Sequence, residues 1–507
     1  MFAKAMSAVY TWNGAISNMT PDISGSVEGR LSLFFKSIRG ISDDKLYEYL
    51  ETSTKENIVD TYILAFQVRD CRGGKGERDI GRKMLKWLFL NTDSKYFEKV
   101  FHLIPEYGRW DDLLLFFPNF LVNFITEDQK NLQEKIIKHI CNKLFEDQKL
   151  MNNGKPVSLV AKWCPTEGDS DDKKHKLVKT ICSNMNITQK EYRTKYITPL
   201  RSYLRVVESL MCRNKWDEIN FNNVPSCAML KLKKAFEKHV PAEFQIWKEG
   251  LKTGASKVNA KQLFPHEIIK EIRQKNGEVD EICEEQWNVL EKEVEKLGSL
   301  EDTLVVVDNS GSMMSPNFLP IDTAYALGLL VSNIVKGEFH GNVITFNDNP
   351  TFFVIKDGDL SSRFAQMSSI PVGYTTDIQK TFEVILERCK KINLPQEKMP
   401  KRILIISDMQ FNCCDVKNNS NTNFQNIEEK YKSSGYDRPD IIFWNVNGST
   451  SDFPVTTDDN GTCLISGMSP SIIKSIINTD KIDSEQIMME TINDNRYKQI
   501  RELLKQI

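Results

Sequence analysis

After Gly298 the sequence consists of short apolar runs, rich in β-branched residues, that alternate with segments of helix length. Such runs are typical of buried strands. Strands that are separated by helices are joined by crossover connections, so they lie parallel in a sheet that is covered on both faces. Residues 299–507 are therefore predicted to form an open, doubly wound α/β domain that ends in helices. The predicted strands are 303–307, 342–346, 352–355, 402–406, 441–446 and 462–465, and the predicted helices are 323–335, 378–389, 424–433 and 469–477.

Residues 1–298 instead carry apolar residues at helical spacing, and we expect a separate α-helical domain with its own core. Two fragments resemble each other, Arg-Trp-Asp-Asp-Leu at 109–113 and Lys-Trp-Asp-Glu-Ile at 215–219. Such an echo is expected where helix pairs stack, so the domain is predicted to be a HEAT-like helical repeat. An irregular helical bundle with two similar helix starts is the alternative. An acidic helix over 278–295 is predicted to connect the two domains.

With 507 residues, of which 40% are hydrophobic and 27% charged, the chain has the composition of a globular protein with more than one domain. No apolar run approaches the roughly 18 residues needed to span a bilayer, and the first residues lack the apolar stretch of a signal peptide. We therefore expect a cytoplasmic protein that contacts no membrane. The 11 cysteines and six histidines are scattered, which disfavours a disulfide framework and a zinc site.

The net charge of −2 conceals a basic segment. Residues 151–275 hold 24 Lys or Arg residues against 13 Asp or Glu residues. This excess indicates a candidate contact surface for a polyanion, and a solvated Lys-rich helical surface is the alternative interpretation.

The first predicted strand leads into Asp308, and the hydroxyls of Ser310 and Ser312 follow at alternate positions in a turn that contains Gly311. One carboxylate and two hydroxyls then face a common point at the carboxyl ends of the strands, where open α/β sheets bind their ligands. These are hard oxygen ligands, which suit Mg²⁺ or Mn²⁺ rather than zinc. The alternative is that Asp308 only caps the turn or helix that follows it.

This motif, Asp-x-Ser-x-Ser after an apolar strand, resembles the metal-ion-dependent adhesion site of the von Willebrand factor A domain. The resemblance implies two further metal ligands from later loops, and these match Thr376 and Asp408, with Thr375 as the less favoured neighbour of Thr376. It also implies that the metal leaves one coordination position open for an acidic group of a partner. The sequence names no general base for hydrolysis, so no catalytic residue is predicted.

The helical half contains a glycine-rich stretch, Arg-Asp-Cys-Arg-Gly-Gly-Lys-Gly-Glu-Arg at 69–78. This stretch resembles the R-x-x-x-G-G-K-G-E-R signature of the Ro ribonucleoprotein family. It is still more similar to an uncharacterised Ro-like family of plants, fungi and large DNA viruses. The Ro resemblance implies an arc or ring of helical repeats, closed by the A-type domain, that binds small structured RNA. The candidate RNA contacts are Arg69, Arg72, Lys75 and Arg78. The alternative is a helix-joining turn in which acidic neighbours pair with these arginines.

We therefore predict a non-enzymatic, Ro-like RNA-binding protein with a Mg²⁺-dependent docking site for an acidic group of a protein partner. The first alternative is a metal-dependent scaffold that binds proteins without RNA. A more remote alternative is a metal-dependent nuclease.

Overall fold

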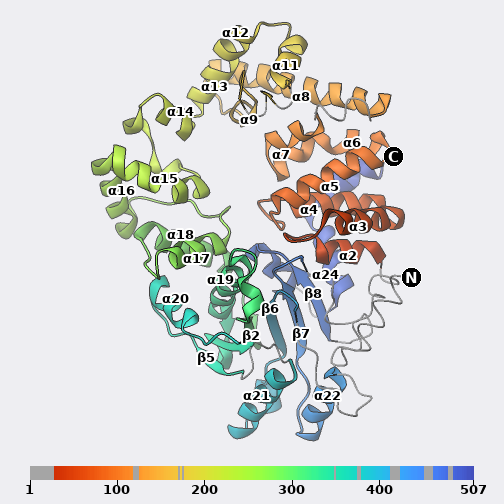
Figure 1. Cartoon of the computed structure of the whole chain (residues 1–507), viewed down its shortest axis with the longest axis vertical. Coiled ribbons are helices and arrows are strands. Elements are labelled where there is room, and N and C mark those ends of the chain that lie inside the picture. The colour runs from red at the N-terminus through yellow and green to blue at the C-terminus, as the bar shows by residue number, and fades with distance from the viewer. Residues whose placement is uncertain are drawn as a thin grey trace.

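The computed structural model of the chain describes residues 28–117, 125–169, 172–173, 176–346, 350–373, 378–410, 423–449, 461–477 and 483–507. It has two parts, an arc of helices and an α/β domain, and both ends of the arc meet the α/β domain (Figure 1). No described helix is both long enough and apolar enough to cross a membrane.

The α/β domain is built on a six-stranded sheet. Its strands are β2 (Thr303–Asp308), β4 (Asn342–Phe346), β5 (Phe352–Val354), β6 (Arg402–Ser407), β7 (Asp440–Asn445) and β8 (Thr462–Ser466). The strand order is β5-β4-β2-β6-β7-β8, and all neighbours are parallel except β4 and β5. The order runs outward in both directions from β2, so the predicted doubly wound sheet is confirmed. Every predicted strand is present, with bounds that differ by at most one residue.

The central strand β2 is buried along its whole length because helices cover the sheet. Helix α19 packs directly on β2. The helices of this domain are α19 (Leu319–Ile334), α20 (Leu360–Ser368), α21 (Ile378–Lys391), α22 (Asn423–Ser433), α23 (Ile473–Ile477), α24 (Ser484–Ile492) and α25 (Lys498–Leu504). Two short strands, β1 (Leu300–Glu301) and β3 (Val335–Lys336), pair with each other beside the main sheet.

The arc contains helices of unequal length, and several of them begin at a side chain that caps free backbone amides. Such caps are provided by Ser42, Asn57, Thr126 and Asp280. The helices are α2 (Glu28–Lys36), α3 (Asp43–Glu56), α4 (Ile58–Arg69), α5 (Arg78–Asn91), α6 (Ser94–Val100), α7 (Ile104–Tyr107), α8 (Glu127–Asn152), α9 (Val160–Trp163), α11 (Leu177–Met185), α12 (Gln189–Glu191), α13 (Thr198–Tyr203), α14 (Val207–Cys212), α15 (Ser226–His239), α16 (Pro241–Thr253), α17 (Pro265–Gln274) and α18 (Glu281–Glu295).

Both ends of the arc are packed onto the α/β domain. Helix α2 contacts β8 and α24, while α25 lies against α4 and α6. At the other end, α17 packs on α19, and Arg273 of α17 forms an ion pair with Asp322 of α19 at 2.7 Å. One continuous hydrophobic core therefore extends from Leu31 to Leu504 through both parts of the chain. A second core, from Val207 to Ile282, lies within the arc alone. The expectation that the helical part and the α/β domain share no core is nevertheless wrong, because the terminal helices of the arc bury apolar faces against the sheet domain.

The two similar fragments of the sequence adopt similar local structures. Each starts a 3₁₀ helix, Trp110–Phe116 in one case and Trp216–Glu218 in the other. The ring of Trp110 stacks on His139 at a centroid distance of 5.5 Å, and that of Trp216 stacks on His239 at 4.0 Å. The two fragments therefore resemble each other in structure as well as in sequence. The HEAT-like repeat type stays a prediction.

Candidate functional site

The carboxyl ends of β2 and β6 lie side by side at the point where the strand order diverges. Asp308 is the last residue of β2, and Asp408 immediately follows β6; both are fully buried. The parallel register pairs Val307, one residue before Asp308, with Ile406, two residues before Asp408. The fold thus brings together two carboxylates that are far apart in the sequence.

Hydrogen bonds connect three of the five residues predicted to bind the metal, and the fourth, Asp408, lies beside them. The amide of Ser310 donates to Asp308 Oδ1 at 2.9 Å, and the Ser310 and Ser312 hydroxyl oxygens lie 3.1 Å apart. The Ser312 side chain lies near enough to Asp408 to oppose the rise in the pKa of that carboxyl. Sequence reasoning missed one member of this network, Ser407, whose hydroxyl donates to Asp308 Oδ2 at 2.5 Å. The sequence offered one signal for Ser407, which is its position at the end of a predicted strand, directly before Asp408.

The electrostatics of this cluster favour a cation. Burial and the nearby charge of Asp408 raise the pKa of Asp308 to about 7. Burial also raises the pKa of Asp408. A divalent cation between the two carboxylates would offset both the lost hydration and the repulsion. Carboxylate and hydroxyl oxygens are the donors that Mg²⁺ prefers, so the described residues fit the predicted ion.

The fifth predicted ligand, Thr376, and its neighbour Thr375 lie outside the described residues. Gly373, the last described residue before them, forms a parallel bridge with Ser310. The Gly311 amide also donates to the carbonyl oxygen of Gly373 at 3.2 Å. The described chain therefore reaches Gly373 directly beside the turn that carries the two serines.

Two of the four residues predicted to contact RNA are buried. Arg69 is 3% exposed, and its guanidinium forms an ion pair with Asp112 at 2.8 Å. Lys75 is 1% exposed, and its ammonium donates to the carbonyl oxygen of Phe34 and, at 2.8 Å, to Ser466 Oγ. The prediction of RNA contacts is therefore wrong for Arg69 and Lys75, because their cationic groups are used inside the fold.

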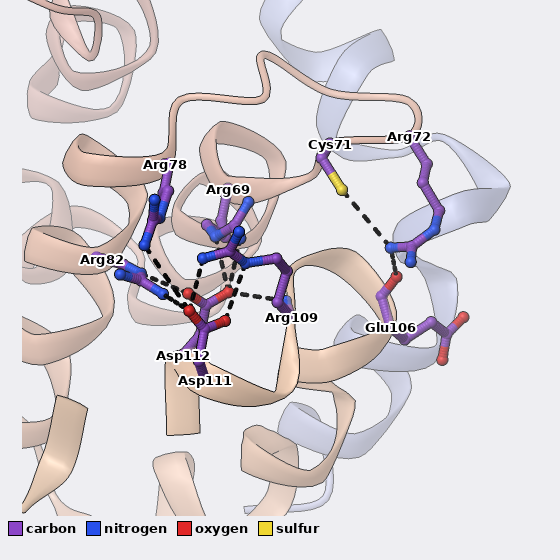
Figure 2. Close-up of polar contacts among 9 residues, drawn as sticks. All are labelled: Arg69, Cys71, Arg72, Arg78, Arg82, Glu106, Arg109, Asp111 and Asp112. Carbon is purple, nitrogen blue, oxygen red and sulfur yellow. Dashed lines mark hydrogen bonds and ion pairs between the residues drawn. The ribbon is translucent and has the colours of Figure 1, made fainter. Parts of the chain in front are cut away.

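The other two predicted residues, Arg72 and Arg78, are exposed and lie in different surroundings (Figure 2). Arg72 donates to the backbone carbonyl oxygen of Glu106. Arg78 lies 3.7 Å from the carboxylate of Asp111, and 51% of its side chain is exposed. Both keep cationic groups within reach of an external ligand.

Figure 2 shows a group of arginines that sequence reasoning did not assemble. Asp112 is fully buried and accepts from the guanidinium of Arg82 at 2.5 Å as well as from Arg69. Asp111 accepts from Arg82 at 2.7 Å and from Arg109 at 2.5 Å. Four guanidinium groups thus face two carboxylates, so the cluster keeps an excess of positive charge. This arginine cluster consists of Arg69, Arg78, Arg82, Arg109, Asp111 and Asp112.

Arg109 connects the cluster to an aromatic ring. Its guanidinium carbon lies 4.0 Å from the centroid of the Trp163 ring, and Lys162 Nζ lies 5.4 Å from the same centroid. Both Arg109 and Trp163 are half-buried, so part of each side chain remains accessible. We refer to Arg78, Arg109, Lys162 and Trp163 as the arginine–tryptophan surface. Cations beside an aromatic ring are the groups with which proteins contact phosphates and unstacked bases.

Comparison with known proteins gives matches over both parts of the chain. Residues 119–300 match the domain of unknown function DUF2828, and residues 302–506 match the domain of unknown function DUF7788. The crystal structure of the Deinococcus radiodurans RO (RSR) protein aligns with 91% of this chain and 98% of that chain, at 11% sequence identity and a TM-score of 0.46. A likeness at this level carries no argument about function.

A full-length relative gives the stronger comparison. The uncharacterised protein L728 of Acanthamoeba polyphaga mimivirus is 30% identical over 482 residues, which cover 90% of this chain and 83% of the viral protein. The chain therefore belongs to the same family as mimivirus protein L728, and within it a region matching DUF2828 precedes a region matching DUF7788.

Proposed function

We propose that this protein is a non-enzymatic RNA-binding protein whose α/β domain docks an acidic partner through Mg²⁺ or Mn²⁺. The observation that carries the RNA part is the arginine–tryptophan surface, where cationic groups in excess of carboxylates adjoin a partly accessible indole ring. The resemblance of the glycine-rich stretch to the Ro ribonucleoproteins supports the same function.

The geometry of this surface suits a nucleic acid backbone. Asp111 and Asp112 neutralise only part of the surrounding positive charge, and Arg78 carries the most exposed of the four guanidinium groups. Exposed guanidinium groups form charge-assisted hydrogen bonds with phosphate oxygens. The ring of Trp163, backed by Arg109, offers a platform on which an unpaired base stacks.

The proposed metal site supplies the docking function. Asp308, Ser310, Ser312 and Asp408, with Thr376 as the fifth ligand, would hold a Mg²⁺ or Mn²⁺ ion. The connected hydroxyls and the two buried carboxylates support this assignment. When bound, the ion would offer a coordination position to a carboxylate or another acidic oxygen of a partner. The carboxylates of Asp308 and Asp408 would balance the charge of the ion, and the turn from Ser310 to Ser312 orients the two serine hydroxyls.

RNA binding is tested with the purified full-length protein and a pool of small structured RNAs in a gel-shift titration. The double variant Arg78→Gln/Lys162→Gln removes two exposed or half-buried cations from the surface and should weaken binding. The matched control is Lys83→Gln/Lys95→Gln, which removes two cations of the helical arc outside the arginine–tryptophan surface. Equal loss of affinity in both double variants, or no RNA binding by the wild-type protein, would contradict the proposal.

The second candidate function is a metal-dependent protein scaffold without RNA. The cluster of Asp308, Ser310, Ser312 and Asp408 favours this function. The cluster contains no residue of the arginine–tryptophan surface, so metal-dependent docking does not require RNA binding. Partner capture that is abolished by EDTA and by Asp308→Asn, from material free of nucleic acid, would favour the scaffold.

A further inference from the structure

A groove of about 540 Å³ lies where helices α15 and α17 of the arc meet the start of α19 (Figure 1). Helix α15 contributes Lys231 and Lys234 to its wall, and α17 contributes Lys270. All three lysines are exposed, and we refer to this feature as the lysine groove. The three lysines belong to the basic segment 151–275 of the sequence, so part of the charge excess of that segment is concentrated here.

The carboxylates in the groove wall do not neutralise these lysines. Asp322 forms an ion pair with Arg273 at 2.7 Å. Glu271 forms an ion pair with the buried Lys233 at 3.0 Å. The carboxylate of Glu267 accepts from a backbone amide at 3.2 Å. No described carboxylate lies within 4 Å of the ammonium group of any of the three groove lysines. The described residues therefore leave three exposed cations in the groove without a counter-ion.

One wall of the groove continues directly from the predicted metal site. This wall includes Pro316, which follows Ser312 by four residues, and four residues span at most about 14 Å. Arg273 ties the turn between them and α19 to α17, because its guanidinium pairs with Asp322 and lies 4.4 Å from the centroid of the Phe318 ring. A polypeptide segment of about ten extended residues is therefore long enough to contact both the predicted metal ligands and the lysines.

The residue types in the groove favour a polypeptide over a nucleic acid. The described wall contains no Phe, Tyr or Trp on which an unpaired base would stack. Its exposed unpaired cations are ammonium groups, which act as compact charges for single carboxylates, whereas the planar guanidinium group is the one that matches phosphates. Arg39 also lines the wall, but it is paired with Glu77 at 2.9 Å. Apolar atoms of Leu230, Pro316 and Leu319 suit the aliphatic parts of a peptide.

We propose that the lysine groove binds an acidic polypeptide segment through Lys231, Lys234 and Lys270, and that this segment belongs to the partner whose acidic group docks at the metal site. The first statement stands without the metal, because no described residue of the predicted metal site lines the groove. The second statement rests on the proposed docking function. Together they describe the partner as a chain with one carboxylate for the ion and further carboxylates within about ten residues of it.

The proposal is tested by fluorescence anisotropy of the full-length protein with a labelled polyglutamate peptide of about ten residues, at low ionic strength, in EDTA and in Mg²⁺. In EDTA, Lys234→Gln/Lys270→Gln should weaken binding about fivefold, because it removes one exposed ion pair from each helix. The matched control is Lys138→Gln/Lys238→Gln, which removes two exposed lysines outside the groove wall. It should change the affinity less than about twofold.

Mg²⁺ should tighten the binding of one peptide per protein, because the ion adds a contact for one carboxylate. Asp308→Asn should remove this effect, which separates an ion at the site from Mg²⁺ bound to the peptide. The groove assignment is overturned if the wild type does not bind the peptide saturably in EDTA, or if the two double variants weaken binding equally. It is also overturned as a polypeptide site if oligouridine of matched length binds more tightly than polyglutamate and loses affinity in Lys234→Gln/Lys270→Gln.

Failure of the groove and failure of the docking function give different results. If Lys234→Gln/Lys270→Gln weakens binding while EDTA and Mg²⁺ give equal affinities, the groove assignment holds, and the docking function and the shared partner are overturned. If Mg²⁺ tightens binding and the lysine variant behaves like its control, the docking function holds and the groove assignment is overturned. Two peptides per protein in Mg²⁺ would overturn the assignment of both sites to one partner.

Discussion

Two adjacent aspartates of the arginine cluster provide a quantitative test of how this part of the arc is stabilised. Asp112→Ala leaves the guanidinium of Arg69 without its carboxylate, in a place where the Arg69 side chain is only 4% exposed and that of Asp112 is inaccessible. Removing one partner of such a buried pair costs about 3–5 kcal/mol of unfolding free energy. Asp111→Ala removes a carboxylate that is 13% exposed and whose partner Arg109 is 28% exposed. The expected cost is about 1 kcal/mol, because water still solvates these partners.

The assay is equilibrium unfolding of both full-length variants in urea, followed by far-ultraviolet circular dichroism. We expect the transition midpoint of Asp112→Ala to lie well below that of Asp111→Ala, which should stay close to the wild type. Because both residues lie in the same 3₁₀ helix, Trp110–Phe116, local helix propensity affects both variants alike. Equal losses at the two positions, or a larger loss for Asp111→Ala, would refute the assignment of Asp112 as the anchor of the cluster.

Three further changes have defined outcomes. Asp308→Asn should abolish Mn²⁺ binding, measured by electron paramagnetic resonance, without lowering the thermal midpoint, because it removes a buried charge that Asp408 repels; retained Mn²⁺ affinity would contradict the metal site. Burial lowers the pKa of His266 to about 3, so below the ordinary value of about 6.5 only the unfolded chain gains this proton. Unfolding measurements should therefore show stability falling by about 1.6 kcal/mol more in the wild type than in His266→Leu between pH 6.5 and 5. Gly74→Ala should strongly destabilise the protein, since its Cβ would lie 2.0 Å from the Gln67 carbonyl oxygen, which is backbone and cannot move aside. Gly73→Ala should be milder, since its Cβ would meet side-chain atoms alone, those of Arg496 at 3.0 Å and of Asp70 at 3.5 Å. Similar midpoints for these two alanine variants would contradict that reasoning.

The sheet and the centre of the candidate metal site could be predicted because their signals are local. Each strand is a continuous apolar run, and parallel strands that end in Asp308 and Ser407 necessarily place those ends at one edge. The hydrogen bond from Ser407 to Asp308 could not be predicted from the sequence, because the Ser407 hydroxyl could equally have faced away from Asp308. The position of a strand end predicts proximity, whereas the direction of a hydroxyl depends on packing.

The glycine-rich stretch was harder to interpret, because its charges are satisfied by distant residues. Arg69 forms an ion pair with Asp112 of a later helix, and Lys75 donates a hydrogen bond to Ser466 of β8, 391 residues later in the chain. No local pattern distinguishes such a cation from one that faces solvent. The core shared by the two parts was missed for the same reason, because α2 and α17 bury faces against elements of the other part.

The most direct test of RNA binding is ultraviolet crosslinking of the intact wild-type protein to RNA, followed by mass spectrometric identification of the crosslinked peptides. We expect adducts at Trp163 or in the peptides that contain Arg78 and Arg109, and we expect these adducts to be lost in Arg78→Gln/Lys162→Gln. Absence of crosslinks under conditions that label a known RNA-binding protein, or adducts confined to the α/β domain, would contradict it.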